Sequence, residues 1–164
     1  MESIIIDAYD LMHKVPELSI LLKQNQDACV DAMIAKLYSH YGSTKIKIIL
    51  VFDGMGKNKN SGHIEIKFSK TEVGGDYGNA DKLIKTLIEK EKNRKLLLIV
   101  SSDNDITWFA KECGCRIQSS QSFWGEIKER RQQVRYAAQD SREKPDVVSR
   151  VEYDFLLKEF TKKN

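Results

Sequence analysis

Acidic residues follow three apolar segments of this chain, at the point where each segment ends. Asp7 follows "SIII", Asp53 follows "IKIILVF", and Asp103 comes three residues after "KLLLIV". Short apolar segments rich in β-branched residues are typical of strands buried on both faces of a parallel sheet. Because parallel strands end at the same edge, where α/β proteins bind their ligands, we expect these three carboxylates to lie together.

More carboxylates lie close to these in the sequence. Asp10 comes one helical turn after Asp7, and Asp105 two positions after Asp103. Asp81 lies in the first turn of a helix predicted after the glycine-rich segment 71–81. The spacing does not fix whether Asp81 points to the edge that Asp7 and Asp103 share.

Each carboxylate also has a purely structural interpretation. Ser102 and Asp105 resemble a capping box, and Asp103 is itself a good N-cap. Asp81 would be favoured by the dipole in a first helical turn, and Asp53 with the following glycine forms a common turn dipeptide. Taken singly, capping and turn formation are the simpler explanations.

The combination favours a metal site. Several carboxylates at one edge repel one another, and a divalent cation removes that penalty. Mg²⁺ and Mn²⁺ prefer carboxylate oxygens, and Mg²⁺ commonly pairs a few carboxylates with substrate phosphates. Carboxylates without histidine or cysteine therefore point to phosphate chemistry, in which the metal activates water and stabilises the displaced oxygen.

Strands alternate with helices along the predicted chain. Besides the three strands above, we expect helices at 26–41, from Asn79 to about Lys92, at 105–112, at 122–139 and at 146–160, and strands at 63–68 and 115–118. This order predicts an α/β three-layer sandwich with a mainly parallel central sheet plus C-terminal helices. We place one domain at 1–122 and a helical extension, packed on the same domain, at 123–164.

Composition restricts the class of protein. The chain has 164 residues, is 41% hydrophobic and 31% charged, and carries a net charge of +3, which suits one soluble domain. It has no apolar run long enough to cross a membrane and no secretory signal, so a cytoplasmic location is expected.

Cys113 and Cys115 could bind zinc, but without a second pair they are better explained as reduced structural thiols. A phospho-acceptor receiver domain would need a lysine at the end of a late strand, which "CRIQSS" lacks.

Several blocks together resemble a known family. "IIIDAYDLMHKVPEL", "ILVFDG", "NADKLIKTLI" and "LLLIVSSDNDITWFAKECGCRIQSSQSF" are similar, in order and spacing, to the YacP-like branch of the NYN family, bacterial proteins with a PIN-like nuclease fold. The resemblance spans about residues 3–124. It implies an endoribonuclease dependent on Mg²⁺ or Mn²⁺, with the acidic metal positions at Asp7, Asp81, Asp103 and Asp105, and a link to messenger RNA cleavage, including on the ribosome.

Two positions depart from the family pattern. The first block usually reads Asp-Gly-Tyr-Asn, whereas here it is "DAYD", with Asp10 in place of the amide. An amide can donate a hydrogen bond, but an ionised carboxylate only accepts. The family's Ala-Asp-Asp is "ADK" here, and Lys82 could contact a phosphate or be a solvated helix residue.

RNA binding requires cations and aromatic faces. We expect Lys57 and Lys59, in a flexible loop after Asp53, to contact phosphates. A basic helix is a second region, or else a solvated face packed through its apolar side; its cations are Lys128, Arg130, Arg131 and Arg135. A lone His13 is more simply a structural polar contact than a general base, and Trp108 is expected to pack within its short helix.

The sequence therefore predicts a PIN-like, metal-dependent endoribonuclease acting on single-stranded RNA or mRNA, without membrane contact. Asp7 and Asp103 are the expected central ligands, completed by Asp81 and Asp105 directly or through water. Ser101 or Ser102 would orient a carboxylate or phosphate, and Asp10 and Asp53 would support the ligands. The alternative is an RNA- or ribosome-binding module with weak or no catalysis, and a weaker one is a protein-interaction domain.

Overall fold

The structure is a computed structural model, and it describes residues 1–73 and 75–129. The strands are β1 (Ser3–Asp7), β2 (Lys47–Met55), β3 (Lys59–Ser61), β4 (Ile64–Thr71), β5 (Gly75–Asp76), β6 (Leu97–Val100) and β7 (Arg116–Gln118). The helices are α1 (Ala8–Lys14), α2 (Pro16–Gln24), α3 (Gln26–Tyr41), α4 (Ala80–Lys90) and α5 (Asn104–Glu112), with a short 3₁₀ turn at Arg94–Leu96. A further helix begins at Ser120 and continues through the described residues up to 129.

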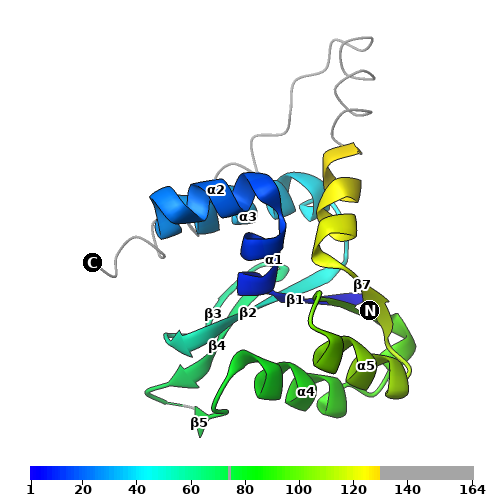
Figure 1. Ribbon diagram of the computed structural model, residues 1–164. Coiled ribbons are helices and arrows are strands. Elements are labelled where there is room, and N and C mark those ends of the chain that lie inside the picture. The colour runs from blue at the N-terminus through cyan, green and yellow to red at the C-terminus, as the bar shows by residue number, and fades with distance from the viewer. Residues whose placement is uncertain (74, 130–164) are drawn as a thin grey trace.

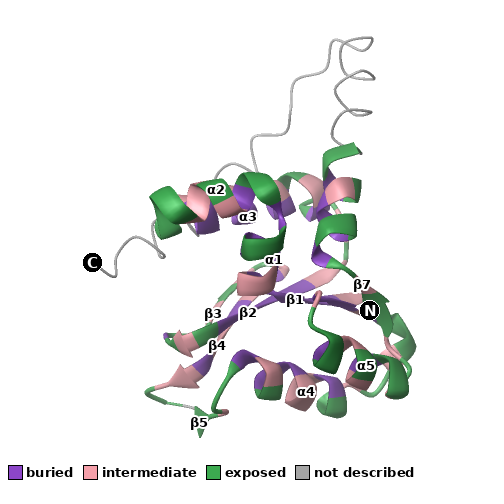
Figure 2. Ribbon diagram, viewed as in Figure 1, coloured by how far each residue is buried: buried purple, intermediate pink, exposed green. Residues whose placement is uncertain are grey.

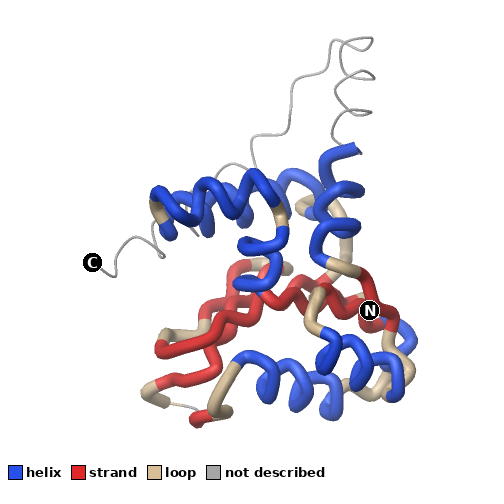
Figure 3. Tube along the Cα trace, viewed as in Figure 1, coloured by secondary structure: helices blue, strands red, loops and turns tan. Residues whose placement is uncertain are grey.

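One sheet in the order β3-β4-β2-β1-β6-β7 forms the centre of the molecule, and β5 pairs with the end of β4. The strands β4, β2, β1, β6 and β7 are parallel, whereas β3 and β5 are antiparallel to β4. Figure 3 shows this sheet between two groups of helices. The predicted α/β architecture with a mainly parallel central sheet is confirmed.

Alternation along the central strands builds two apolar cores, because successive side chains point to opposite faces of a sheet. In β1, Ile4 and Ile6 join one core and Ile5 joins the other. The first core lies under α1, α2, α3 and the helix that begins at Ser120; the second lies under α4 and α5 (Figure 1). Figure 2 shows the buried residues concentrated on the sheet and on the helix faces that meet it. Because both faces of the central strands are buried, their sequences are continuous apolar runs and do not alternate with polar residues.

The longer helices begin where the sequence indicates. Helix α3 spans the predicted 26–41, and Gly42 follows its last residue. Helix α4 is capped by Asn79, whose side-chain oxygen accepts from the Lys82 backbone N–H, and it buries Leu83, Ile84 and Ile88 against the sheet. Its end at Lys90 is two residues earlier than predicted.

Three features differ from the prediction. Residues 8–24 form two short helices, α1 and α2, separated by Val15 and begun again by Pro16 at the first helical position. Lys59 lies in edge strand β3 and not in a flexible loop. Trp108 does not pack within its helix, since 64% of its surface is exposed. The predicted helices beyond residue 129 lie outside the described residues.

Within the residues that the structure describes, no helix is long and apolar enough to cross a membrane.

Candidate functional site at the carboxyl edge of the sheet

Asp7 ends β1 and Asp103 follows β6, whereas Asp53, predicted to follow its strand, lies inside the last part of the neighbouring strand β2, which continues to Met55. The register pairs Asp7 with Val51 in β2, and pairs Ile6 with Val100 in β6. Strands β1 and β6 therefore end at nearly the same level, and Asp53 lies only two residues beyond Val51 in β2, so the three acidic residues lie at one edge. We call this set, together with Asp10, Asp81 and Asp105, the carboxylate edge.

Asp7 is the most buried member, with 8% of its surface exposed. Its Oδ1 accepts the Asp10 backbone N–H at 3.2 Å, which caps α1, and its Oδ2 accepts the Ser101 hydroxyl at 3.4 Å. Burial raises the pKa of Asp7 from 3.8 to about 6, and the charges of Asp10 and Asp81 add to this increase. The two hydrogen bonds lower the pKa, but burial outweighs them.

Asp81 faces the same edge from the first turn of α4. Its pKa is raised mainly by burial and next by the charge of Asp103, with smaller contributions from Asp105 and Asp53, while Lys85 lowers it. Asp81 in turn raises the pKa of Asp7. These interactions of Asp81 with Asp103, Asp53 and Asp7 answer the question that spacing left open, because they place Asp81 near the strand ends.

Asp103 serves as the N-cap of α5. Its Oδ1 accepts the backbone N–H groups of Asp105 at 2.8 Å and Ile106 at 3.2 Å. Its own backbone N–H donates to the Ser101 hydroxyl at 3.1 Å, so the buried Ser101 links Asp103 to Asp7. Both capping bonds use Oδ1, and within the described residues no hydrogen bond is made to Oδ2. The predicted cap is present, and it leaves one carboxylate oxygen for another ligand.

Asp105 is held by an ion pair. Lys85 Nζ lies 2.7 Å from Asp105 Oδ2, and the Asp105 side chain is 72% exposed. Lys85 is one helical turn after Asp81 on α4, so one ammonium group partly neutralises two acidic residues of the edge. The sequence prediction did not include Lys85, although its four-residue spacing from Asp81 was a usable signal.

Asp10, the residue in place of the family's amide, stabilises the turn after β6. Its Oδ2 accepts the Ser102 backbone N–H at 2.7 Å and the Ser120 hydroxyl at 2.5 Å. Ser102 in turn accepts the Ser120 backbone N–H through its hydroxyl oxygen. A carboxylate suits this position because every bond it makes is one that it accepts. Ser120 was not predicted, since an isolated serine 110 residues away carries no spacing signal.

Asp53 is fixed by a second serine that the sequence did not single out. Ser69 of β4 donates its hydroxyl to Asp53 Oδ1 at 2.7 Å and accepts the Gly54 backbone N–H. The same Asp53 oxygen accepts the Ala80 backbone N–H at 3.2 Å. Asp53 therefore ties the start of α4, and with it Asp81, to the end of β2.

The donor set suits a hard divalent cation in its chemistry. It consists of carboxylates whose charges raise the pKa of Asp7 and of Asp81, and a divalent cation would relieve that repulsion. The side chains do not form a coordination shell as they stand: among the described residues, no three of histidine, cysteine, aspartate and glutamate approach one another closely enough to hold a metal ion. The capping bond of Asp103 and the ion pair of Asp105 are what hold these two side chains in their present positions.

The cations predicted to contact RNA are spread over the molecule. Lys57 borders a cleft of about 250 Å³ at the end of β2 and β4. Lys59 lies further down the sheet, opposite Ile66. The ammonium of Lys82 lies over Gly78 in the loop before α4. Lys128 pairs with Glu17 of α2 at 2.9 Å. Arg130, Arg131 and Arg135 lie outside the described residues.

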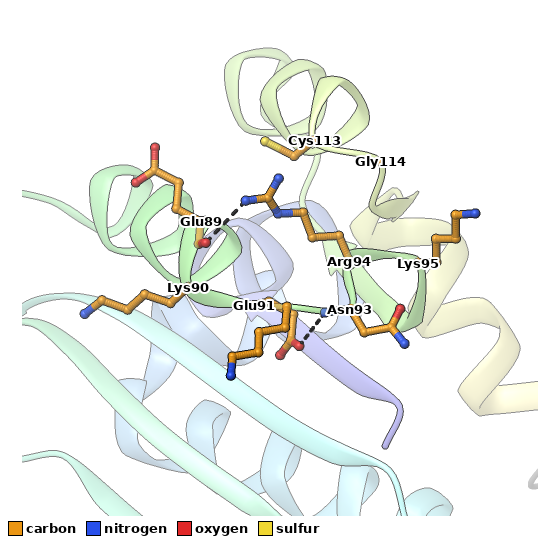
Figure 4. Close-up of a pocket in the computed structure, with 9 residues that line it drawn as sticks. Glu89, Lys90, Glu91, Asn93, Arg94, Lys95, Cys113 and Gly114 are labelled. Carbon is orange, nitrogen blue, oxygen red and sulfur yellow. Dashed lines mark hydrogen bonds between the residues drawn. The ribbon is translucent and has the colours of Figure 1, made fainter.

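A cavity of about 660 Å³ lies at the opposite edge of the sheet, between the last residues of α4 and α5 (Figure 4). Cys113, Arg94 and Lys95 are among its lining residues, and Arg94 donates to the Ile88 and Glu89 carbonyls that end α4. Cys113 and Cys115 are free thiols that pack against the core under α4 and α5. None of the carboxylate-edge residues lines this cavity, so we do not assign the chemistry to it.

Two solved structures resemble this fold along nearly the whole chain. The structure of a single-substitution variant of Rae1 (YacP) from Bacillus subtilis matches with a TM-score of 0.66 and 25% identity, covering 92% of this chain and 90% of that one. The structure of Rae1 (YacP) without that substitution matches with a TM-score of 0.63 and 24% identity, covering 99% and 94%. No curated protein sequence matches the chain.

The family model described as the YacP-like NYN domain matches residues 4–161. This match covers nearly all of the chain, including every residue of the carboxylate edge. The family match, together with the structural similarity, supports a PIN-like fold and a nuclease-like, RNA-related function. The chain belongs to the YacP-like NYN domain family.

Proposed function

We propose that the protein is a metal-dependent endoribonuclease that uses Mg²⁺ or Mn²⁺ at the carboxylate edge. One observation carries the proposal: Asp7 is buried beside other carboxylates at a strand end, with its pKa raised to about 6. A fold does not keep a buried carboxylate in such company for stability, because the arrangement costs free energy at neutral pH. Carboxyl groups whose pKa is shifted by burial and by neighbouring charges are typical of functional sites.

In this proposal Asp7, Asp81 and Asp103 hold the metal, and Asp105 joins them directly or through water. When bound, the cation supplies an activated water and stabilises negative charge on the phosphate. The protein's own groups prepare the ligands. The capping hydrogen bonds orient Asp7 and Asp103. Asp10 stabilises the turn that carries Asp103. Lys85 holds Asp105 in an ion pair while no metal is bound.

The proposed substrate is single-stranded RNA, with messenger RNA as the natural class, the ribosome as a partner and the cytoplasm as the location. Lys57, two residues after β2, and Lys82, next to Asp81 in α4, are the first proposed phosphate contacts. Lys59, Lys128, Arg130, Arg131 and Arg135 would extend the contact over a longer strand. Phosphate contacts of this kind predict that RNA affinity falls steeply as the salt concentration rises.

The experiment that tests the proposal is cleavage of a labelled single-stranded RNA with Mg²⁺, Mn²⁺ or EDTA. The full-length protein is compared with Asp7→Asn and Asp103→Asn, and with Glu112→Gln as a matched control on the exposed far end of α5. We expect cleavage with a metal, a loss of at least 100-fold in both aspartate variants, and no change in the control. Cleavage that survives Asp7→Asn would reject the assignment.

A related measurement separates the nuclease from a module that only binds RNA. Mn²⁺ affinity is measured on the wild-type protein and on Asp103→Asn, and ribosome binding is measured by co-sedimentation. Equal Mn²⁺ affinity in the two proteins would remove Asp103 from the metal site. RNA or ribosome binding without cleavage under any metal would favour the binding module.

A further inference from the structure

Trp108 is the one phenylalanine, tyrosine or tryptophan that is exposed among the residues the structure describes. Its surface is 64% exposed, whereas the other tryptophan, Trp124, is 3% exposed and donates its indole N–H to Glu17. A large aromatic side chain left in water forgoes considerable burial energy. Within the described part of the chain, the Trp108 ring contacts neither another aromatic ring nor a cation. Nothing in the packing of α5 accounts for it.

The position of Trp108 relates it to the carboxylate edge. Ile106 and Ala110 are fully buried and face the sheet, so Trp108, about 200° from each around the helix, points away from the sheet. It lies three residues after Asp105, about 4.5 Å further along the helix axis. Side chains on a helix lean toward its N-terminus, so the indole leans toward the turn that carries Asp105.

The neighbouring groups leave the face of the indole available. Thr107 turns its hydroxyl back to the Asp103 and Asn104 carbonyls. Lys85 is taken up by Asp105 and by the ring of Phe109, with its Nζ 5.6 Å from that ring's centre. The exposed outer face of α5 is visible in Figure 2. An apolar platform thus flanks a strongly acidic edge.

We propose that Trp108 stacks on an unpaired nucleobase next to the phosphate that is cut, an inference that rests on the proposed ribonuclease function. The carboxylates repel the RNA backbone, so binding energy at this edge has to come from the bases or from bound cations. A nucleobase offers a flat face to an aromatic ring whatever its identity, and only a base outside a duplex can reach one. The platform therefore selects single-stranded over double-stranded RNA, without a strong sequence preference.

The first test uses tryptophan fluorescence and needs no catalysis. A short single-stranded RNA is added with Mg²⁺ to full-length Asp103→Asn, so that the RNA remains intact, and to the same protein carrying Trp108→Leu. We expect the RNA to quench the exposed tryptophan in the first protein and to leave the buried Trp124 emission of the second unchanged. Equal quenching in the two proteins, or none in either, would overturn the inference.

The second test uses cleavage rates. Trp108→Leu is expected to lower kcat/KM on single-stranded RNA about 10-fold, because base stacking on an aromatic ring contributes a factor of roughly 5 to 150. Trp108→Phe retains a stacking face and is expected to recover most of the loss. Ile20→Ala is the matched control, since Ile20 is 60% exposed on α2. Circular dichroism and Tm are measured for every variant, so that a folding defect is not mistaken for lost stacking.

An abasic scan identifies the base. Removing one base at a time from the RNA is expected to slow the wild-type protein at a single position beside the cut. The same removal is expected to have no further effect on Trp108→Leu, since two changes that delete one contact are not additive. Independent effects of the two changes would overturn the inference.

The outcomes separate this inference from the proposed function. If the wild-type protein cuts RNA and Trp108→Leu cuts it equally fast, the stacking role is wrong and the nuclease stands. If no metal supports cleavage, the nuclease is wrong, and the fluorescence titration alone decides whether Trp108 binds a base. If sedimentation shows a dimer that Trp108→Leu converts to a monomer, Trp108 is a self-association contact and the inference is overturned.

Discussion

Replacing Asp7 by asparagine should stabilise the metal-free protein while abolishing cleavage. A carboxyl whose pKa rises to about 6 on folding is ionised only at a cost to the folded state. Between about pH 4 and pH 6 the folded chain binds more protons at this site than the unfolded chain, so stability falls as the pH rises. Above pH 6 the full cost, about 3 kcal/mol, is present.

Asparagine removes this cost and keeps most of the local bonds. Its side-chain oxygen can still accept the Asp10 N–H, and asparagine caps helices as well as aspartate. The attraction between the negative charge and the N-terminus of α1 is already part of the net pKa of Asp7, since the Asp10 N–H lowers that pKa. We therefore expect an increase of up to about 3 kcal/mol in the free energy of unfolding at pH 7.5.

Urea denaturation in EDTA at pH 7.5 and at pH 4 measures the effect. The advantage of Asp7→Asn should be present at pH 7.5 and nearly vanish at pH 4, where the wild-type carboxyl is protonated when folded. Asp105→Asn is the control, since that exposed side chain makes a surface ion pair of little energetic value. With saturating Mn²⁺ the order should reverse, because only the wild-type protein gains stability from the bound metal. An Asp7→Asn protein less stable than wild type at pH 7.5 in EDTA would refute the reasoning.

Three further outcomes follow from the same contacts. Mn²⁺ affinity, measured by calorimetry, should fall as the pH drops below about 6, because protons then compete with the metal for Asp7. Lys85→Met removes the cation that lowers the pKa of Asp81, so the acid limb of the pH–rate profile should move to higher pH; an unmoved limb would exclude Asp81 from that titration. Asp10→Ala leaves the Ser102 N–H without its acceptor and should lower the free energy of unfolding by about 1–3 kcal/mol in urea denaturation.

The strand ends were predictable because the information is local. An apolar run followed by aspartate identifies a buried strand and its carboxyl end, and the parallel arrangement then brings Asp7, Asp53 and Asp103 together. The asparagine before α4 gave the start of that helix in the same way. Trp108 was also within reach, since its spacing from Ile106 and Ala110 puts it on the face opposite the buried one.

Other features depend on contacts that have no local signature. Ser120 contacts Asp10 from 110 residues away, and Ser69 contacts Asp53 from 16 residues away. Serine is so common that its spacing from an aspartate does not predict a contact. Helices α1 and α2 were missed because Val15 and Pro16 interrupt the apolar periodicity after only seven residues of α1. The position of Asp81 depends on how the loop before α4 folds, and Asp53 fixes it through the Ala80 backbone N–H.

Capping a helix and binding a metal are compatible roles for the same aspartate. Asp7 and Asp103 both use Oδ1 to cap the helix that follows their strand, so the N-termini of α1 and α5 are directed toward the carboxylate edge. Helix N-termini stabilise negative charge, which partly offsets the repulsion among the carboxylates. The caps also fix the orientation of each carboxyl group, and at Asp103 they leave Oδ2 without a partner among the described residues. At Asp103, therefore, one carboxylate oxygen caps the helix while the other remains for a metal ion.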